Sequence, residues 1–306
     1  MLNLLLRAGY FISIIILGFI LKKVGLFKDS DFSVLSNIVL KITLPAAIVV
    51  NFANMQIDFS MLAIAFLGFF GGAVYVCVAL LINTKSSKEQ RAFDVLNLPG
   101  YNIGVFALPF IQGFLGPIGV VSTSLFDVGN AFICLGGSFG IASAIKNGSS
   151  FSFNRIVKAL LRSVPFITYI FMMILCLARI PFPVQIVDFA QIIANANAFL
   201  AMLMIGVGFK LTADRKQIRR IVKIVSLRYG IAAVLAAVLA AVFYFLLPFS
   251  AEIRNTLVIL AFSPIGAAVP PFTKELNSDY GLSSAINSIC IICSIVFMVI
   301  LLGILR

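Results

Sequence analysis

The amino-acid sequence predicts an all-α polytopic membrane protein whose ten transmembrane helices form two inverted halves of five. Three observations predict this fold class: an apolar composition, ten apolar stretches long enough to span a membrane, and a motif that recurs in both halves. Of the 306 residues, 61% are hydrophobic and only 11% are charged, whereas soluble domains carry about 25% charged residues. The composition is therefore that of a membrane protein.

Ten stretches are apolar over windows of about 19 residues, the length that crosses the hydrocarbon core as a helix. They cover residues 3–23, 32–53, 60–82, 95–114, 118–143, 157–178, 184–209, 219–247, 252–274 and 281–305. The first stretch is too long for a signal peptide and lacks an A-x-A cleavage pattern, so it is interpreted as a span.

The positions of the basic residues predict the orientation. Of the 23 Lys and Arg residues, 17 lie in loops that follow odd-numbered spans, and four lie in the other loops or at the termini. Because cytoplasmic loops are enriched in Lys and Arg, both termini are expected outside, in a protein of the plasma membrane. The net charge of +12 is then a topology signal, and no basic stripe predicts binding to nucleic acid.

A motif recurs in the two halves. NIGVFALPF (102–110) in span four matches PIGAAVPPF (264–272) in span nine at a shift of 162 residues, with the Ile-Gly and Pro-Phe pairs aligned. Each half has an odd number of spans, so the second half enters the membrane in the opposite orientation. The predicted repeats are residues 1–150 and 151–306, a 5+5 inverted repeat.

Both copies of this motif interrupt an apolar span with Pro and Gly. Proline removes a backbone donor, and glycine costs about 1 kcal/mol in a helix interior. In secondary transporters, paired breaks mark the binding site, because half-helix N-termini attract anions and unwound carbonyls hold cations. The alternative is that the prolines only kink the helices, which is the weaker interpretation for breaks matched in two halves.

The pattern N-x-G…LP in span four, the proline-rich break in span nine and YGLSSAINSICIICSIV (280–296) accompany the ten spans. With these features the whole chain resembles the auxin efflux carrier family, which includes plant PIN proteins and bacterial malonate and malate permeases. The resemblance is strongest over 95–130 and 255–300. The long cytoplasmic loop of many plant members is absent, which favours a bacterial-type carrier.

The resemblance implies a scaffold domain of spans 1, 2, 6 and 7, a moving core of spans 3–5 and 8–10, and a homodimer formed through the scaffold. It also implies the fold of bile acid:sodium symporters and sodium/proton antiporters. Pro264 stands opposite Asn102 in the repeat, so the breaks do not carry matching asparagines. The implied substrate-binding positions are Asn102, Gly104, Pro109, Pro264, Gly266, Pro270 and Pro271.

Three ionisable residues lie inside spans: Lys41, Asp127 and Arg228. Lys41 and Asp127 are about 14 Å deep at a rise of 1.5 Å per residue, near the middle of a core about 30 Å thick. Charges at such depth are rare and usually functional. Lys41 and its counterpart in the second half, Asn197, are predicted to bind substrate.

Asp127, Asn130 and Arg228 are predicted to couple transport to a proton or a sodium ion. Asn130 follows Asp127 by three residues and extends its polar face. Two alternatives stay open: Lys41 and Arg228 could snorkel toward the cytoplasm, and Asp127 could form a structural ion pair.

The sequence gives no indication of an enzyme. It has no histidine, which excludes a Ser-His triad, and no G-x-x-x-x-G-K-[ST] motif for ATP. GGSFG (136–140) lies in an apolar helix instead of a strand-to-helix elbow. No cofactor or metal is expected.

The sequence therefore predicts a secondary transporter that moves a small organic anion, a mono- or dicarboxylate of the auxin, malonate or malate kind. The predicted mechanism is elevator-type alternating access through the crossing of spans four and nine. A sodium-coupled symporter of the bile acid type, a passive anion channel and a membrane sensor are the alternatives.

Overall fold

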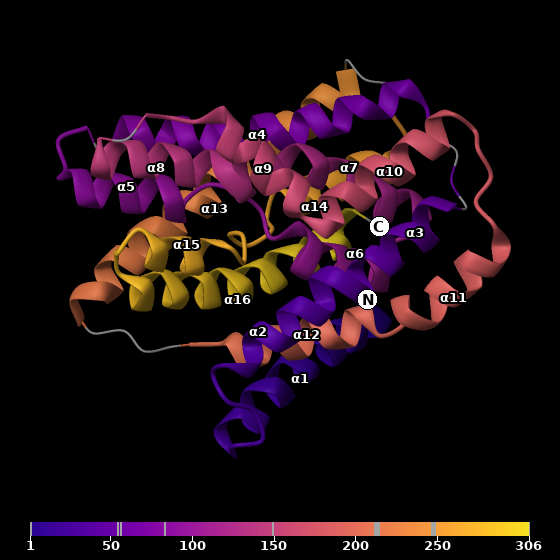
Figure 1. The fold of residues 1–306 in the computed structure, drawn as a ribbon, viewed down its shortest axis with the longest axis horizontal. Helices are drawn as coiled ribbons and strands as arrows, with labels where there is room; N and C mark the ends of the chain where they lie inside the picture. The colour runs from indigo at the N-terminus through magenta and orange to yellow at the C-terminus, as the bar shows by residue number, and fades with distance from the viewer. Residues whose placement is uncertain are drawn as a thin grey trace.

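The computed structural model describes residues 2–53, 55, 57–82, 84–148, 150–210, 215–245 and 249–305. These residues form helices joined by short connections, and no strand occurs among them (Figure 1). Arg306, one of the basic residues counted at the termini, lies outside this part of the chain.

The described residues of the first half form eight α-helices. They are α1 (Leu2–Lys23), α2 (Asp31–Ile38), α3 (Leu44–Ala53), α4 (Ala63–Ile82), α5 (Lys88–Asn97), α6 (Leu108–Phe114), α7 (Pro117–Phe132) and α8 (Ser138–Asn147). Three π-helical segments join or extend them: Val39–Thr43, Ile103–Ala107 and Ile133–Gly137. A short 3₁₀ turn, Phe59–Leu62, precedes α4.

Eight more α-helices follow among the described residues of the second half. They are α9 (Phe153–Arg162), α10 (Val164–Leu177), α11 (Val184–Ala194), α12 (Asn197–Gly208), α13 (Arg215–Phe245), α14 (Ala251–Leu260), α15 (Val269–Glu275) and α16 (Tyr280–Leu305).

Six helical stretches among the described residues are long and apolar enough to cross a membrane. They are Asp31–Ala53, Phe59–Ile82, Pro117–Asn147, Val184–Gly208, Gln217–Val242 and Tyr280–Leu305. The bent pair of α9 and α10 adds a seventh if it counts as one span. The chain is thus an all-helical polytopic membrane protein, and the ten-span 5+5 arrangement stays a prediction.

The sixth expected span, 157–178, is not continuous. Its two helices, α9 and α10, meet at 80°. Ser163 lies at the bend, and its hydroxyl accepts a hydrogen bond from the N–H of Phe166 at 3.4 Å. Pro165 follows in the first turn of α10, where its missing donor is tolerated. The capping serine and the proline therefore start a new helix where apolarity alone predicted a straight one.

Two helix pairs pack at very close range through glycine. A Cβ at Gly206 of α12 would collide with the carbonyl oxygen of Ile15 in α1. A Cβ at Gly129 of α7 would collide in the same way with the carbonyl oxygen of Ala65 in α4. Small residues let membrane helices approach until their backbones touch, so these positions fix the two pairs.

The other helices pack around these two pairs. In Figure 1, α5, α8, α13, α15 and α16 lie to the left, and α3, α10 and α11 lie to the right. α3 packs against α10 and α11, and α2 packs against α12, whereas α5 packs on α8 and α13 packs on α14 and α16. Contacts of α7 with α3 and α10, and of α6 with α12, link the two sides. The division into scaffold and core stays a prediction.

Candidate functional site at the crossing of two broken helices

The chain leaves the helical conformation at both predicted interruptions. The first break runs from the end of α5 at Asn97 to Ile103, and the second runs from the end of α14 at Leu260 to Val269. Gly100 has φ of 78°, a conformation that glycine adopts without steric cost. The N–H of Asn102 donates a hydrogen bond to the carbonyl oxygen of Pro264 at 2.8 Å. The two positions aligned by the internal repeat are therefore in direct contact.

Asn130 of α7 satisfies the unwound backbone of the first break. Its Oδ1 accepts from the N–H of Tyr101 at 2.9 Å, and its Nδ2 donates to the carbonyl oxygen of Tyr101 at 2.8 Å. Backbone groups inside a membrane must find partners within the protein. The paired bonds of one amide thus replace the helical bonds that the break removes.

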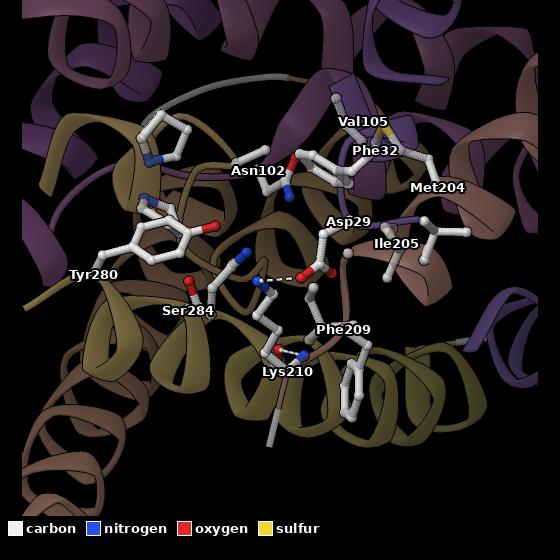
Figure 2. Close-up of a pocket in the computed structure, with 18 residues that line it drawn as sticks. Asp29, Phe32, Asn102, Val105, Met204, Ile205, Phe209, Lys210, Tyr280 and Ser284 are labelled. Carbon is white, nitrogen blue, oxygen red and sulfur yellow. Dashed lines mark hydrogen bonds and ion pairs between the residues drawn. The ribbon is translucent and has the colours of Figure 1, made fainter. Parts of the chain in front are cut away.

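A first cavity, of about 130 Å³, lies beside the crossing (Figure 2). Asn102, Pro270 and Pro271 line it from the two breaks, and Ser284 and Asn287 line it from α16. The Oδ1 atom of Asn287 is buried and has no hydrogen-bond partner among the described residues. The cavity thus combines an unused amide acceptor with neighbouring hydroxyl groups, and its volume is large enough for several water molecules or a small polar solute.

Charged residues lie at the other side of this cavity (Figure 2). Lys210 Nζ lies 3.3 Å from Asp29 Oδ2, and Lys22 Nζ lies 2.7 Å from Asp29 Oδ1. These two ammonium groups, first of all Lys22, hold the pKa of Asp29 below its ordinary value of 3.8. Lys210 also donates its backbone N–H to Ser288 Oγ of α16 at 3.1 Å. Asp29 and Lys210, the charged residues of the cavity lining, balance each other, and Lys22 adds a positive charge beside Asp29.

A second cavity, of about 120 Å³, is lined by Asp127 and Tyr169. Asp127 Oδ1 accepts from Asn130 Nδ2 at 2.9 Å, and Asp127 Oδ2 accepts from the hydroxyl of Tyr169 at 3.2 Å. No ion pair of Asp127 occurs in the described part of the chain. Its partners are therefore neutral groups, in contrast to the ion pair considered from the sequence.

Glycines of both breaks provide close approach at the second cavity. A Cβ at Gly104 would lie 2.9 Å from Leu44 Cδ2 and 3.4 Å from Asp127 Oδ2. A Cβ at Gly266 would collide with the sulfur of Cys134. Larger side chains at these positions would fill the space beside Asp127.

The two cavities meet at the crossing itself. Asn102, Val105 and Ala267 line both of them, and Asn102 is only 5% exposed. The two breaks thus form the wall that separates the cavities.

Four predicted substrate-binding residues line neither cavity: Pro264, Pro109, Asn197 and Lys41. Pro264 takes part in the crossing through its carbonyl oxygen, which accepts the hydrogen bond from Asn102. Pro109 is buried in the first turn of α6. Asn197 is buried, and its Oδ1 accepts a hydrogen bond from Thr43 Oγ1 at 2.9 Å. Lys41 is exposed on the outer surface of its helix. Val39 and Thr43 form the buried face of the same segment, so the polar face that includes Lys41 points away from the site.

Arg228 lies at the crossing, but its surroundings differ from those expected. Its side chain is fully buried, so it does not snorkel toward the cytoplasm. Nη1 donates to the carbonyl oxygen of Leu98 at 2.6 Å, and Nη2 donates to the carbonyl oxygens of Gly100 and Ser263 at 2.9 and 2.7 Å. Arg228 thus binds the backbone of both breaks.

Sequence reasoning missed several residues that line the cavities. Tyr169 lies in an apolar predicted span, where a tyrosine is most simply interpreted as a residue of the hydrophobic core. In the sequence, Lys210 is one of many basic residues in the loops. Its position at a cavity depends on the tertiary fold. Ser284, Asn287 and Ser288 recur at helical spacing in span ten, and this polar face was a signal that could have been used.

Two broken helices that cross inside a polytopic all-helical protein, with a cavity on each side, are typical of a membrane transporter. Residues 10–150 match the sequence model of the family described as "Membrane transport protein". This match supports the resemblance to the auxin efflux carrier family over these residues. No curated protein matches the chain.

Proposed function

We propose that this protein is a secondary carrier for small organic anions, with mono- and dicarboxylates as the substrate class. The observation that carries the proposal is the crossing, where Asn102 bonds to Pro264 at 2.8 Å and lines both cavities. A small movement of the breaks would transfer a substrate bound at this wall from one cavity to the other. Asn102, Gly104, Gly266, Pro270 and Pro271 are its proposed contacts.

The charge around the crossing supports an anionic substrate. Lys210 and Lys22 share the single carboxylate of Asp29 at the first cavity, and Arg228 places another cation behind the breaks. Ser284 and Asn287 offer hydrogen bonds on the same cavity. Carboxylates are bound by such charge-assisted and neutral hydrogen bonds together.

We propose a proton as the coupling ion and Asp127 as its carrier. Asp127 lines the second cavity and has only neutral partners, Asn130 and Tyr169. A carboxylate without a nearby cation changes its protonation state more readily than a paired one. The alternative, a sodium-coupled symporter of the bile acid type, would need oxygen ligands for the ion at the crossing.

The movement that we propose is an elevator motion of the two breaks past the scaffold. Tyr169 lies on α10, in the proposed scaffold, and Asp127 lies on α7, in the proposed core. Their hydrogen bond crosses the boundary and would break or reform with the movement. The protein is proposed to act in the plasma membrane with both termini outside, as a homodimer joined through the scaffold.

Transport by purified protein in proteoliposomes tests this function. Labelled mono- and dicarboxylates are supplied under an imposed pH gradient, and uptake is followed against substrate concentration. A carrier shows saturable uptake that an excess of unlabelled substrate inside the vesicles accelerates. A passive channel shows flux that does not saturate, and a sensor binds the anion without moving it.

A further inference from the structure

Arg228 is a buried cation without a carboxylate partner in the described part of the chain. Its side chain is fully buried in the middle of α13. None of the ion pairs among the described residues includes it. A guanidinium group keeps its charge under all physiological conditions, so backbone and aromatic groups must stabilise it.

These groups form a site of the kind that binds a monovalent cation. Three carbonyl oxygens, of Leu98, Gly100 and Ser263, accept hydrogen bonds of 2.6, 2.9 and 2.7 Å from the guanidinium. The rings of Tyr75 and Tyr101 lie 5.0 and 5.5 Å from its Cζ, within the range of cation–π attraction. The charge is therefore enclosed by carbonyl oxygens and ring faces.

The three carbonyls come from both interruptions. Leu98 and Gly100 belong to the break after α5, and Ser263 belongs to the break after α14. In carriers with broken helices, unwound carbonyls and helix C-terminal ends coordinate the coupling cation. Here one side chain of the protein binds the oxygens that such an ion would need.

We propose that Arg228 is the built-in cation of the crossing: it joins the two breaks and occupies the carbonyl cluster in place of an exchangeable metal cation. This inference rests on the proposed function for its transport consequences but not for its binding chemistry. Arg228 is a positioning residue, because its N–H groups bind the carbonyl oxygens of Leu98, Gly100 and Ser263. The substrate itself is bound by Asn102. Transport by the native protein then requires no sodium ion.

The test compares the native protein with Arg228→Ala. Arg254→Ala is the matched control, because Arg254 on α14 donates to the side chain of Asn255 and has no hydrogen bond to either break among the described residues. Melting temperatures in detergent are measured in choline chloride, sodium chloride and low-millimolar guanidinium chloride. We expect guanidinium, and more weakly sodium, to raise the melting temperature of Arg228→Ala only. Equal melting of Arg228→Ala in all three salts would overturn the proposal.

Uptake in proteoliposomes provides the second readout, with the pH gradient and membrane potential held constant. The native protein is expected to transport equally in sodium and in choline, and Arg228→Lys, which keeps a cation, is expected to be slower but equally insensitive to sodium. Sodium stimulation of either protein would contradict the proposal, even if Arg228→Ala did not fold. If the native protein moved no carboxylate at all, the proposed function would fail, whereas the melting experiment would still decide the role of Arg228.

Discussion

Tyr169 of α10 donates its hydroxyl hydrogen to Asp127 of α7 over 3.2 Å. Asn130 donates to the other oxygen of the same carboxylate. The carboxylate is thus held by two neutral donors at the second cavity, and no described cation pairs with it. Protonation of Asp127 therefore breaks no ion pair among the described residues.

The first prediction concerns this carboxylate. Asp127→Asn keeps the size and a hydrogen-bonding oxygen, so we expect it to fold and to bind substrate. It cannot exchange a proton, so uptake should no longer respond to an imposed pH gradient. Uptake in proteoliposomes at several gradients measures this response.

Tyr169→Phe serves as the control for Asp127→Asn. It removes one hydrogen bond, worth about 1 kcal/mol, but leaves the carboxylate in place. We expect lower stability and an altered rate, with the pH response retained. Full pH-driven accumulation by Asp127→Asn would contradict proton transfer through this residue.

The second prediction concerns the ion pairs of Asp29. Because Lys22 and Lys210 lower its folded-state pKa below 3.8, the pairs stabilise the protein above that pH, and the contribution is lost as Asp29 is protonated at lower pH. The side chain is 64% exposed, so we expect about 0.5 kcal/mol or less. Thermal melts of the native protein and Asp29→Asn should differ by a constant amount from pH 5 to pH 8 and converge in stronger acid. A difference that grows as the pH falls would have the wrong sign.

The third prediction concerns orientation. In a background without the native cysteines, Thr84→Cys and Ser150→Cys are expected to be shielded from an impermeant thiol reagent in intact cells. Ala251→Cys, at the start of α14 and directly after the eighth predicted span, should be labelled. The reverse pattern would overturn the orientation derived from Lys and Arg, and the inverted-repeat interpretation with it.

Apolarity and periodicity were sufficient to predict an all-helical membrane protein and the positions of both breaks, because proline and glycine act locally. The internal repeat aligned Asn102 with Pro264, but their hydrogen bond is known only from the structure. Packing decided the rest. The polar face of Lys41 turned outward, because Val39 and Thr43 form the buried face of that segment.

Other parts of the site depend on contacts between residues far apart in the chain. Arg228 lies about 130 residues from Leu98, and no local pattern indicates which carbonyls its guanidinium binds. The same holds for Lys210, which reaches Asp29 from the other half of the sequence. Such partners are set by tertiary packing and not by spacing.

The fourth prediction concerns the close approach at Gly104. In Gly104→Ala the new Cβ would lie 2.9 Å from the end of the Leu44 side chain, which can rotate away, so most uptake should remain. In Gly104→Leu three further carbons would fill the second cavity beside Asp127, and uptake should be lost. Equal uptake by the two variants would show that the space beside Gly104 is not used.

The central claim is that the substrate is bound at the crossing, and uptake by Asn102→Leu tests it most directly. The backbone bond from residue 102 to Pro264 is kept in this variant, whereas the polar side chain that lines both cavities is removed. Asn37→Leu, a similar change at an exposed position on α2, is the control. Saturable carboxylate uptake is measured for both in proteoliposomes, after equal insertion has been verified. We expect Asn102→Leu to lose at least about 90% of uptake, as removal of one hydrogen bond to a charged substrate group implies, and Asn37→Leu to retain it. Native uptake by Asn102→Leu would contradict substrate binding at the crossing.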